Sequence, residues 1–504
     1  MKKKTRFLSA LLAVLMAVGP LASCATTDDT NDDSNHVTTA AVSEEETKLD
    51  ALPADLDYGN EEITIISRDL EGWTRGEISV EKLNGDAVND AVYERNKAVE
   101  QRLNVKINSI LENTSDAGLV INKVATAVQA GTGEYDIMAG TSYHAASESL
   151  NGTFVNLLDT EYIDLEQPYW TQGYNEAMSY NGMQFSALGH MLLSVYRFAF
   201  VTVFNKDLFT NANQPFPYDT VEEGKWTLDK QTSLVPLFHR DDGNGQQDME
   251  GDVYGFISSR LISTDAYWSS CQVDIIKKNG DGELELVFDS AKLYEVAEKV
   301  LALYYGTDKA SYTMPAHGAD SEQDDIRNMF SEGYGAMATL RIMALESSIM
   351  RNMEHEYGVL PMPKFDEIQE SYHTLLHDQF TIVAIPTTVT GERLDMVSAV
   401  IEAMGSASYQ IVKPVYYEET LRTKIAQDPQ SALMMDIITD GLYIDAGIIY
   451  LNTIGSFHDG LRSIVGNNSN NAVSAFKAKM KSAKKSLEKD LMGKLDKIAL
   501  ESQG

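Results

Sequence analysis

The sequence predicts an α/β protein, because short β-branched runs alternate with amphipathic segments in its first third. Residues 62–67 (Glu-Ile-Thr-Ile-Ile-Ser) are typical of a buried strand, and residues 84–103 place apolar side chains on one helical face. A second strand at 104–107, a helix at 121–129 and a third strand at 134–140 follow. Strands and helices in this order predict a parallel sheet.

The ends of two predicted strands carry the side chains most suited to binding. Residues 67–69 (Ser-Arg-Asp) follow the first strand, and residues 140–143 (Gly-Thr-Ser-Tyr) follow the third. Ligands of parallel sheets collect at the carboxyl ends of the strands. We therefore expect both segments to contribute to a binding site.

The C-terminal part is predicted to be mostly helical from about residue 405. Residues 473–498 place apolar side chains three, four or seven positions apart among many lysines. This spacing favours a helix that packs on the protein body over one that binds a partner helix.

The N-terminus is typical of an exported lipoprotein. Four basic residues precede an apolar run at 7–18, which is too short to span a bilayer permanently. Residues 21–24 (Leu-Ala-Ser-Cys) resemble a bacterial lipobox. We expect residues 1–23 to be a signal peptide and Cys24 to be acylated, which would hold the protein on the extracellular face of the cytoplasmic membrane. The alternative is an ordinary secretory signal with a coincidental cysteine.

The segment that follows is predicted to be a tether. Residues 24–57 are acidic and rich in Thr and Asp, with little apolar surface to bury. No second long apolar run is present, so we expect no further membrane span.

Composition excludes some classes of partner. The formal net charge is −34, and removal of residues 1–23 takes away four of 41 basic residues and none of 75 acidic ones, leaving −38. Such a charge argues against binding nucleic acid, which requires Lys and Arg. With Cys24 acylated, Cys271 is the one remaining thiol, so we expect packing rather than a disulfide to stabilise the fold.

Enzyme motifs are not found in the sequence. It has no GxSxG, P-loop, GxGxxG or HExxH pattern, and we expect no catalytic residues and no enzymatic activity. A lipid-anchored glycoside hydrolase is an alternative, because 75 acidic residues offer many carboxylate pairs.

One acidic loop resembles a fragment of a calcium-binding loop. Asp242, Asn244 and Asp248 would supply the oxygens, but Gln246 stands where the third ligand of an EF-hand belongs. A turn rich in Asn, Asp and Gly needs no ion. We expect no metal or cofactor, with structural calcium at these three residues as the alternative.

Five segments match the motifs of one family in their order and spacing. They are residues 204–209 (Phe-Asn-Lys-Asp-Leu-Phe), 225–229 (Lys-Trp-Thr-Leu-Asp), 252–256 (Asp-Val-Tyr-Gly-Phe), 330–337 (Phe-Ser-Glu-Gly-Tyr-Gly-Ala-Met) and 357–363 (Tyr-Gly-Val-Leu-Pro-Met-Pro). Over roughly residues 60–460 the chain thus resembles the family 1 extracellular solute-binding proteins. These are lipid-anchored receptors of bacterial carbohydrate ABC importers.

The resemblance implies a two-lobed, type II periplasmic-binding-protein-like fold. Each lobe would be a mainly parallel sheet flanked by helices, with a hinge between the lobes. Residues 58–198 and 384–413 would form lobe 1, and residues 199–383 and 414–504 would form lobe 2. Crossings between lobes would lie near 195–203, 377–384 and 413–417.

The resemblance also implies a function. A monomeric receptor would bind a carbohydrate, specifically an oligosaccharide, in the cleft between its lobes and deliver it to an ABC permease. A receptor for a peptide or polyamine is an alternative, because the acidic chain could favour a cationic ligand. An adhesion or scaffold lipoprotein, which would not close on a ligand, is another.

Candidate ligand-binding residues follow from the chemistry of sugars. A sugar presents apolar C–H faces and a ring of hydroxyl groups, so its receptor needs aromatic rings and planar hydrogen-bonding groups. Near the expected strand ends and crossings, the candidates are Arg68, Asp69, Trp73, Tyr143, His144, Tyr196, Arg197, Tyr267, Trp268, Arg341 and Asp378.

Overall fold

The computed structural model describes residues 50–287, 290–315, 318–456, 458–469 and 472–502. They belong to one compact unit, Lys48–Gly504. The predicted signal peptide, Cys24 and the predicted tether up to residue 49 lie outside the described residues.

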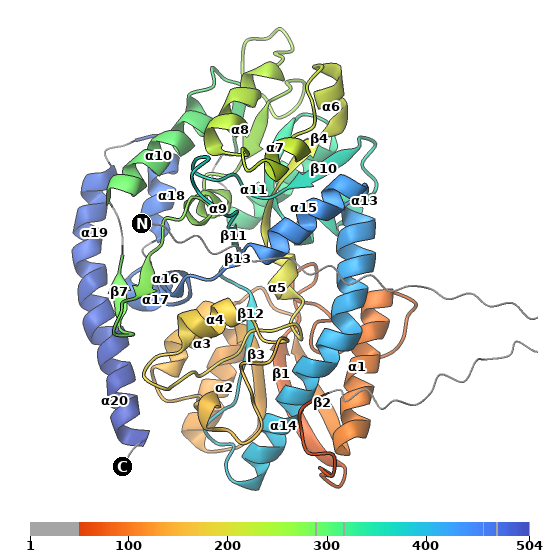
Figure 1. The fold of residues 1–504 in the computed structure, drawn as a ribbon, viewed down its shortest axis with the longest axis vertical. Coiled ribbons are helices and arrows are strands. Elements are labelled where there is room, and N and C mark those ends of the chain that lie inside the picture. The colour runs from red at the N-terminus through yellow and green to blue at the C-terminus, as the bar shows by residue number, and fades with distance from the viewer. Residues whose placement is uncertain (1–49, 288–289, 316–317, 457, 470–471, 503–504) are drawn as a thin grey trace, which may run out of the picture. The chain divides into compact units, whose positions relative to one another are not determined.

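The first lobe is built on a four-stranded sheet in the order β12-β3-β1-β2 (Figure 1). β1 (Glu61–Arg68) pairs in parallel with β2 (Val105–Glu112) and β3 (Ile137–Thr141), and β12 (Thr381–Ala384) pairs antiparallel to β3. The three strands predicted near the start of the chain are confirmed, and so is their parallel arrangement.

Local sequence explains where the first long helix begins and ends. α1 (Ala87–Leu103) begins after Asp86, whose side chain accepts hydrogen bonds from the backbone N–H groups of Val88 and Asn89. It ends at Asn104, which adopts the left-handed conformation with φ 51°. α2 (Leu119–Ala130) provides the second predicted helix.

The second lobe is built on a five-stranded sheet in the order β10-β4-β9-β5-β8. Its strands are β4 (Phe200–Asn205), β5 (Phe256–Ser258), β8 (Ser311–Thr313), β9 (Met337–Arg341) and β10 (Tyr357–Leu360). β5 is parallel to β8 and β9, but β4 is antiparallel to β9 and β10. The expected mainly parallel sheet is therefore found in the first lobe, whereas only two of the four strand pairs in the second lobe are parallel. The reason is that β4 brings the chain directly from the first crossing into the second lobe, whereas each of the other four strands follows one or more helices.

Two crossings between the lobes run side by side. The first follows α5 (Ser194–Arg197) into β4, and the second leads back into β12. Ala199 and Leu376 form an antiparallel bridge, and the N–H of His377 donates to the carbonyl of Phe198 at 2.9 Å. Both crossings lie near their predicted positions.

The third crossing is a long helical segment (Figure 1). α14 (Glu392–Ala407) continues through two π-helical stretches, η3 (Ser408–Val412) and η4 (Val415–Ile425), towards α15 (Pro429–Asp440). Pro414 stands between the two stretches and has no N–H for an α-helical hydrogen bond, so wider turns at this point are expected. This crossing also lies where it was predicted.

The predicted lobe boundaries differ from the structure in two places. β12 begins at Thr381 and already belongs to the first sheet, so the return precedes residue 384. Residues after 414 are not confined to the second lobe, because α16 (Ala446–Ile449) and α17 (Leu451–Ile454) contact α3 (Ser142–Ser149) in the first.

The last residues of the predicted tether are folded. Leu52 is 5% exposed, and Asp50 forms an ion pair with Arg102 at 3.2 Å. The tether prediction is therefore wrong for residues 50–57, because these residues pack on α1 by way of Arg102.

The core extends through both lobes and holds most of the large aromatic side chains. Trp170, Trp226 and Trp268 are buried, and Cys271 is a fully buried free thiol whose pKa burial raises to about 12. Within the described ranges, no helix has the length and apolar character needed to cross a membrane.

The remaining elements surround the two sheets. The other strands are β6 (Ile276–Lys278), β7 (Leu284–Leu286), β11 (Thr374–Leu375) and β13 (Leu442–Tyr443). The other helices are η1 (Leu157–Asp159), α4 (Gln172–Met178), α6 (Lys206–Asn211), α7 (Tyr218–Glu222), α8 (Leu228–Leu234), η2 (Val235–Leu237), α9 (Ile262–Ser270), α10 (Ser290–Tyr305), α11 (Ala319–Ser331), α12 (Ile342–Leu345), α13 (Ser348–Arg351), α18 (His458–Gly466), α19 (Ala472–Ser486), η5 (Leu487–Met492) and α20 (Gly493–Ser502). The predicted C-terminal helix at 473–498 is thus present as α19, η5 and α20.

Candidate functional site

A cavity of about 570 Å³ lies between residues of the two lobes. The first lobe contributes the loop after β1, the first crossing contributes Arg197, and the second lobe contributes α11 and the segment from the end of β9 through α13. The lining residues are Glu71, Gly72, Trp73, Arg75, Arg197, Gln323, Asp324, Arg327, Arg341, Met343, Ala344, Glu346, Ser347, Ser348 and Arg351.

The loop after β1 is held in place by its own polar groups. The hydroxyl of the buried Thr74 donates to the carbonyl of Arg68 at 2.8 Å and accepts from the N–H of Leu70 at 3.1 Å. Asp69 accepts from the N–H of Gly76 at 2.9 Å. These bonds close the loop around Trp73 and position its indole at the cavity.

Trp73 connects the two lobes at the cavity wall. The Cζ atom of Arg341, the last residue of β9, lies 4.6 Å from the centroid of the indole ring, and that of Arg68 lies 5.5 Å from it. The ring of Phe198 meets the indole edge-on at 5.5 Å. Trp73 therefore contacts both lobes and the first crossing.

Arg197 ties the first crossing to both sides of the cavity. Its Nε lies 3.3 Å from a carboxylate oxygen of Glu346, and its Nη1 donates to the carbonyl of Arg75 at 3.1 Å. Burial acts to lower the pKa of Arg197, but Glu346, Tyr416 and Glu77 together outweigh it and the pKa is raised. Glu346 also accepts a hydrogen bond from Tyr416 on the third crossing.

A buried acid lies beneath the same loop. Glu77 is 1% exposed and accepts hydrogen bonds from the N–H of Ser194 at 3.0 Å and from the hydroxyl of Thr381. Burial raises the pKa of Glu77, although these hydrogen bonds and Arg197 act to lower it. Glu77 thus links the loop after β1 to the first two crossings.

Some predicted site residues lie at the cavity and others lie close to it. Trp73, Arg197 and Arg341 line it. Asp69 lies outside it and, with Arg197, lines a neighbouring cavity of about 510 Å³. Arg68 is 3% exposed and reaches the site through its contact with Trp73.

A second group of predicted residues gathers at the ends of β1 and β3. The rings of Tyr143 and His144 lie 4.4 Å apart, and burial and Asp378 raise the pKa of Tyr143 to about 12. Burial lowers the pKa of His144. The structure brings Tyr143, His144 and Asp378 together near Arg68, but they do not line the 570 Å³ cavity.

Three predicted aromatic residues belong to the core instead. Tyr196 is 3% exposed and bonds to Nδ1 of His190 at 2.7 Å. Tyr267 and Trp268 lie on α9, where Tyr267 is fully buried and its hydroxyl bonds to Thr339 of β9 at 2.9 Å. Their expected place in the cleft is corrected, because α9 packs both rings inward.

Several lining residues were not predicted from the sequence. They include the arginines and polar groups at positions 75, 323, 327, 346 and 351. Gln323 and Arg327 stand four residues apart on α11, so their spacing indicates that both side chains lie on one face of a helix. Arg75 stands two residues after Trp73, on the same loop.

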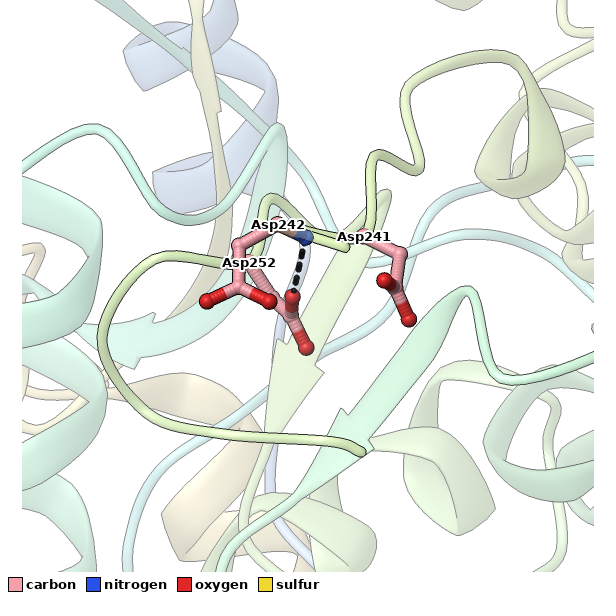
Figure 2. A group of neighbouring side chains, drawn as sticks. All are labelled: Asp241, Asp242 and Asp252. Atoms are coloured by element: carbon pink, nitrogen blue, oxygen red, sulfur yellow. Dashed lines mark hydrogen bonds between the residues drawn. The ribbon is translucent and has the colours of Figure 1, made fainter. Parts of the chain in front are cut away.

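The acidic loop that suggested calcium is a hydrogen-bonded turn. Carboxylate oxygens of Asp241, Asp242 and Asp252 lie within 4.8 Å of one another (Figure 2). The amide nitrogen of Asn244 donates to Asp248 at 2.6 Å and to Asp242 at 3.3 Å. Asn244 therefore directs a donor, not an oxygen, towards the other two predicted ligands.

Asp252 is the buried member of this group. It accepts from the N–H of Asp242 at 2.9 Å, as Figure 2 shows, from the N–H of Asp248 at 3.2 Å and from the hydroxyl of Tyr254 at 2.8 Å. Burial acts to raise the pKa of Asp252, but these hydrogen bonds outweigh it and the pKa is lowered. Protein donors thus satisfy this carboxylate.

Comparison with known proteins identifies the fold. No family model matches the sequence, and no curated protein matches it by sequence. Three solved structures that cover most of the chain are similar to it. The ABC substrate-binding protein Lmo0181 from Listeria monocytogenes, in complex with cycloalternan, is 14% identical with a TM-score of 0.52, over 85% of this chain and 98% of that one.

The other two are similar to the same extent. An ABC transporter solute-binding protein from Thermotoga lettingae, bound with α-D-tagatose, is 15% identical with a TM-score of 0.54, over 85% of this chain and 100% of that one. UgpB from Mycobacterium tuberculosis, in complex with glycerophosphocholine, is 15% identical with a TM-score of 0.53, over 86% of this chain and 100% of that one. The chain therefore has the two-lobed fold of ABC-transporter solute-binding proteins. The fold that the sequence motifs implied is confirmed.

Proposed function

We propose that this protein is an extracellular, lipid-anchored receptor that binds a carbohydrate and delivers it to an ABC importer. The observation that carries the proposal is the cavity between the lobes, where Trp73 lies among forked hydrogen-bonding side chains. The solved structures of this fold include proteins in complex with cycloalternan, α-D-tagatose and maltotetraose.

The cavity has the chemistry that a sugar requires. An indole offers an apolar plate to C–H groups, and guanidinium and carboxylate groups offer planar donors and acceptors to hydroxyls. Gln323 is 5% exposed and donates to the hydroxyl of Ser263 at 2.8 Å, and its Oε1 has no hydrogen-bond partner among the described residues. A sugar hydroxyl would satisfy that oxygen.

Ligand-dependent closure follows from the placement of the cavity. A sugar that touches Trp73 in the first lobe and Arg341 in the second has its full set of contacts only when the lobes are close together. It therefore favours the closed state, and the three crossings are where the movement would occur. A permease that recognises the closed state would receive only loaded receptor.

The enzymatic alternative fits the cavity less well. A glycoside hydrolase needs two carboxyl groups facing the scissile bond, one of them protonated. The three acidic residues that line the cavity are each ion-paired: Glu71 with Arg75, Asp324 with Arg327 at 2.9 Å, and Glu346 with Arg197 at 3.3 Å.

A thermal-shift screen of the purified protein tests the proposal. Mono- and oligosaccharides would be compared with peptides and polyamines, and each mixture would be analysed for reaction products. A ligand present at one hundred times its Kd stabilises the folded state by about 2.7 kcal/mol. We expect shifts with one series of glycans and no product. Shifts with peptides or polyamines alone would overturn the substrate class, and product formation would favour the hydrolase.

The lipid anchor is tested separately. The protein with Cys24 replaced by Ala should leave the membrane fraction of a Gram-positive host and appear in the medium. Retention of this variant on the membrane would refute anchoring through Cys24.

A further inference from the structure

The first of the C-terminal helices carries a charge opposite to that of the chain as a whole. α19 holds five lysines and no acidic residue, whereas the chain has a formal net charge of −34. The four acidic residues of the segment 472–502 all come after α19. Positive charge is therefore concentrated on one helix of an acidic protein.

The lysines of this helix lie on the side that faces away from the protein body. Lys481 and Lys485 are exposed and stand four residues apart, and the exposed Lys489 continues this spacing into η5. Ala483 and Leu487 stand two residues after the first two lysines and are each 2% exposed. Two residues turn an α-helix by about 200°, so the lysines and the apolar side chains occupy opposite faces. The helices α17 and α18 contact α19 and cover part of its surface.

No described neighbour neutralises this charge. Four side chains of α19 are both exposed and without an ion pair to any described residue: Lys479, Lys481, Lys484 and Lys485. Among the acids that follow, Asp496 accepts a hydrogen bond from Nδ2 of Asn181 in the first lobe at 2.9 Å. The lysines therefore present their full charge to whatever lies outside the protein.

The outer side of α19 suits a charged surface better than a protein partner. Ser482 lies between the lysines, and no large apolar side chain is exposed among residues 479–486. Specific protein interfaces usually have an apolar or aromatic core, which this surface lacks. Anionic lipid headgroups require only that several cations come close to them.

We propose that a lysine face, formed by Lys481, Lys484, Lys485 and Lys489, lies against the anionic phospholipid headgroups of the membrane. A lipid tether would raise the effective concentration of this face at the membrane. The acidic remainder of the protein is repelled by the same headgroups, so the receptor is held in one orientation. This inference rests on the proposed function only for the location of the protein at the membrane.

Vesicle co-sedimentation tests the inference. The purified Cys24→Ala protein, which lacks the proposed acylation site, would be mixed with vesicles of phosphatidylcholine and with vesicles that also contain phosphatidylglycerol. No sugar would be added. We expect binding to the anionic vesicles alone, and its loss at high ionic strength, because salt screens exposed charges. Equal binding to both kinds of vesicle, or to neither, would refute the inference.

Two pairs of exposed lysines provide matched variants. The test variant combines Lys481→Gln with Lys485→Gln, and the control combines Lys230→Gln on α8 with Lys424→Gln on η4. All four side chains are exposed and have no ion pair with a described residue, so both variants should keep the melting temperature of the parent protein.

The two variants lose the same charge but should differ in binding. Each lysine near an anionic surface strengthens binding about fivefold, so K481Q/K485Q should weaken vesicle binding on the order of 25-fold. K230Q/K424Q should bind as the parent protein does. Equal losses in the two variants would show that overall charge controls binding, and would refute the lysine face.

Two further measurements separate this inference from its alternatives. A dimer in sedimentation equilibrium that K481Q/K485Q dissociates would show that a second copy covers the lysine face, and would overturn the inference. Sugar binding should be the same in both variants, because none of these lysines lines the 570 Å³ cavity. Failure of vesicle binding would therefore leave the sugar receptor standing, and failure of every sugar would leave the membrane contact standing.

Discussion

Glu402 should make the stability of the protein depend on pH between 5 and 8. It lies on α14 with 1% of its surface exposed and accepts hydrogen bonds from the hydroxyl of Tyr169, from Nε1 of Trp170 at 3.3 Å and from the N–H of Asp164 at 3.2 Å. Burial raises its pKa from 4.5 to about 7, although these hydrogen bonds act to lower it.

The sign of the effect follows from proton binding. Between pH 4.5 and about 7, the folded protein keeps a proton on Glu402 that the unfolded chain releases. The stabilisation that comes from protonated Glu402 is therefore fully present below pH 4.5 and is lost as the pH rises through about 7. The shift corresponds to roughly 3 kcal/mol in total, of which about 2.5 kcal/mol falls between pH 5 and 8.

The assay is urea unfolding at pH 5, 6, 7 and 8, and Glu402→Gln is the test variant. The Gln side chain cannot ionise, so the variant lacks this loss of stability. From pH 5 to 8 its unfolding free energy should therefore rise by about 2.5 kcal/mol relative to that of the wild type. Glu392→Gln, on an exposed residue of the same helix, should follow the wild type. Parallel profiles for E402Q and wild type would refute the reasoning, because the other buried acids would then account for the whole pH dependence.

Three further predictions concern the site, the core and the acidic loop. Trp73→Ala should reduce ligand affinity, measured by calorimetry, by about 1–2 kcal/mol through lost ring contacts. Trp268→Ala should instead lower the unfolding free energy by about 3–5 kcal/mol. The reverse pattern would contradict the placement of the two rings. Leu52→Ala should destabilise the protein by about 2–3 kcal/mol in urea unfolding, and no change would show that residues 50–57 are not packed. Calcium should leave the melting temperature unchanged, because protein donors satisfy Asp252; a rise that Asp242→Asn abolishes would instead establish a calcium site.

The fold was more accessible from the sequence than the site. β1 and α1 each have a local pattern, and the β-branched run of β1 places Ile63, Ile65 and Ile66 in the core. The antiparallel direction of β4 has no such pattern in the sequence, because it depends on how the chain arrives from the first lobe.

Sequence position pointed to the cavity-lining residues near strand ends and did not point to those that line the cavity through packing between distant segments. Trp73 lies in the loop after β1 and Arg341 is the last residue of β9, and both line the 570 Å³ cavity. Arg327 lies in the middle of α11, and only the tertiary arrangement turns its face to the cavity. Tyr267 and Trp268 were misplaced because the sequence does not show that α9 packs both rings into the core.

The burial of Cys271 has a practical consequence for measuring lobe movement. Its thiol is inaccessible and its pKa is raised to about 12, so thiol-reactive dyes should leave it unlabelled. A cysteine introduced on each lobe could then carry a donor and an acceptor fluorophore without removal of the native residue. The distance between the dyes would report opening and closing in single molecules as candidate ligands are added.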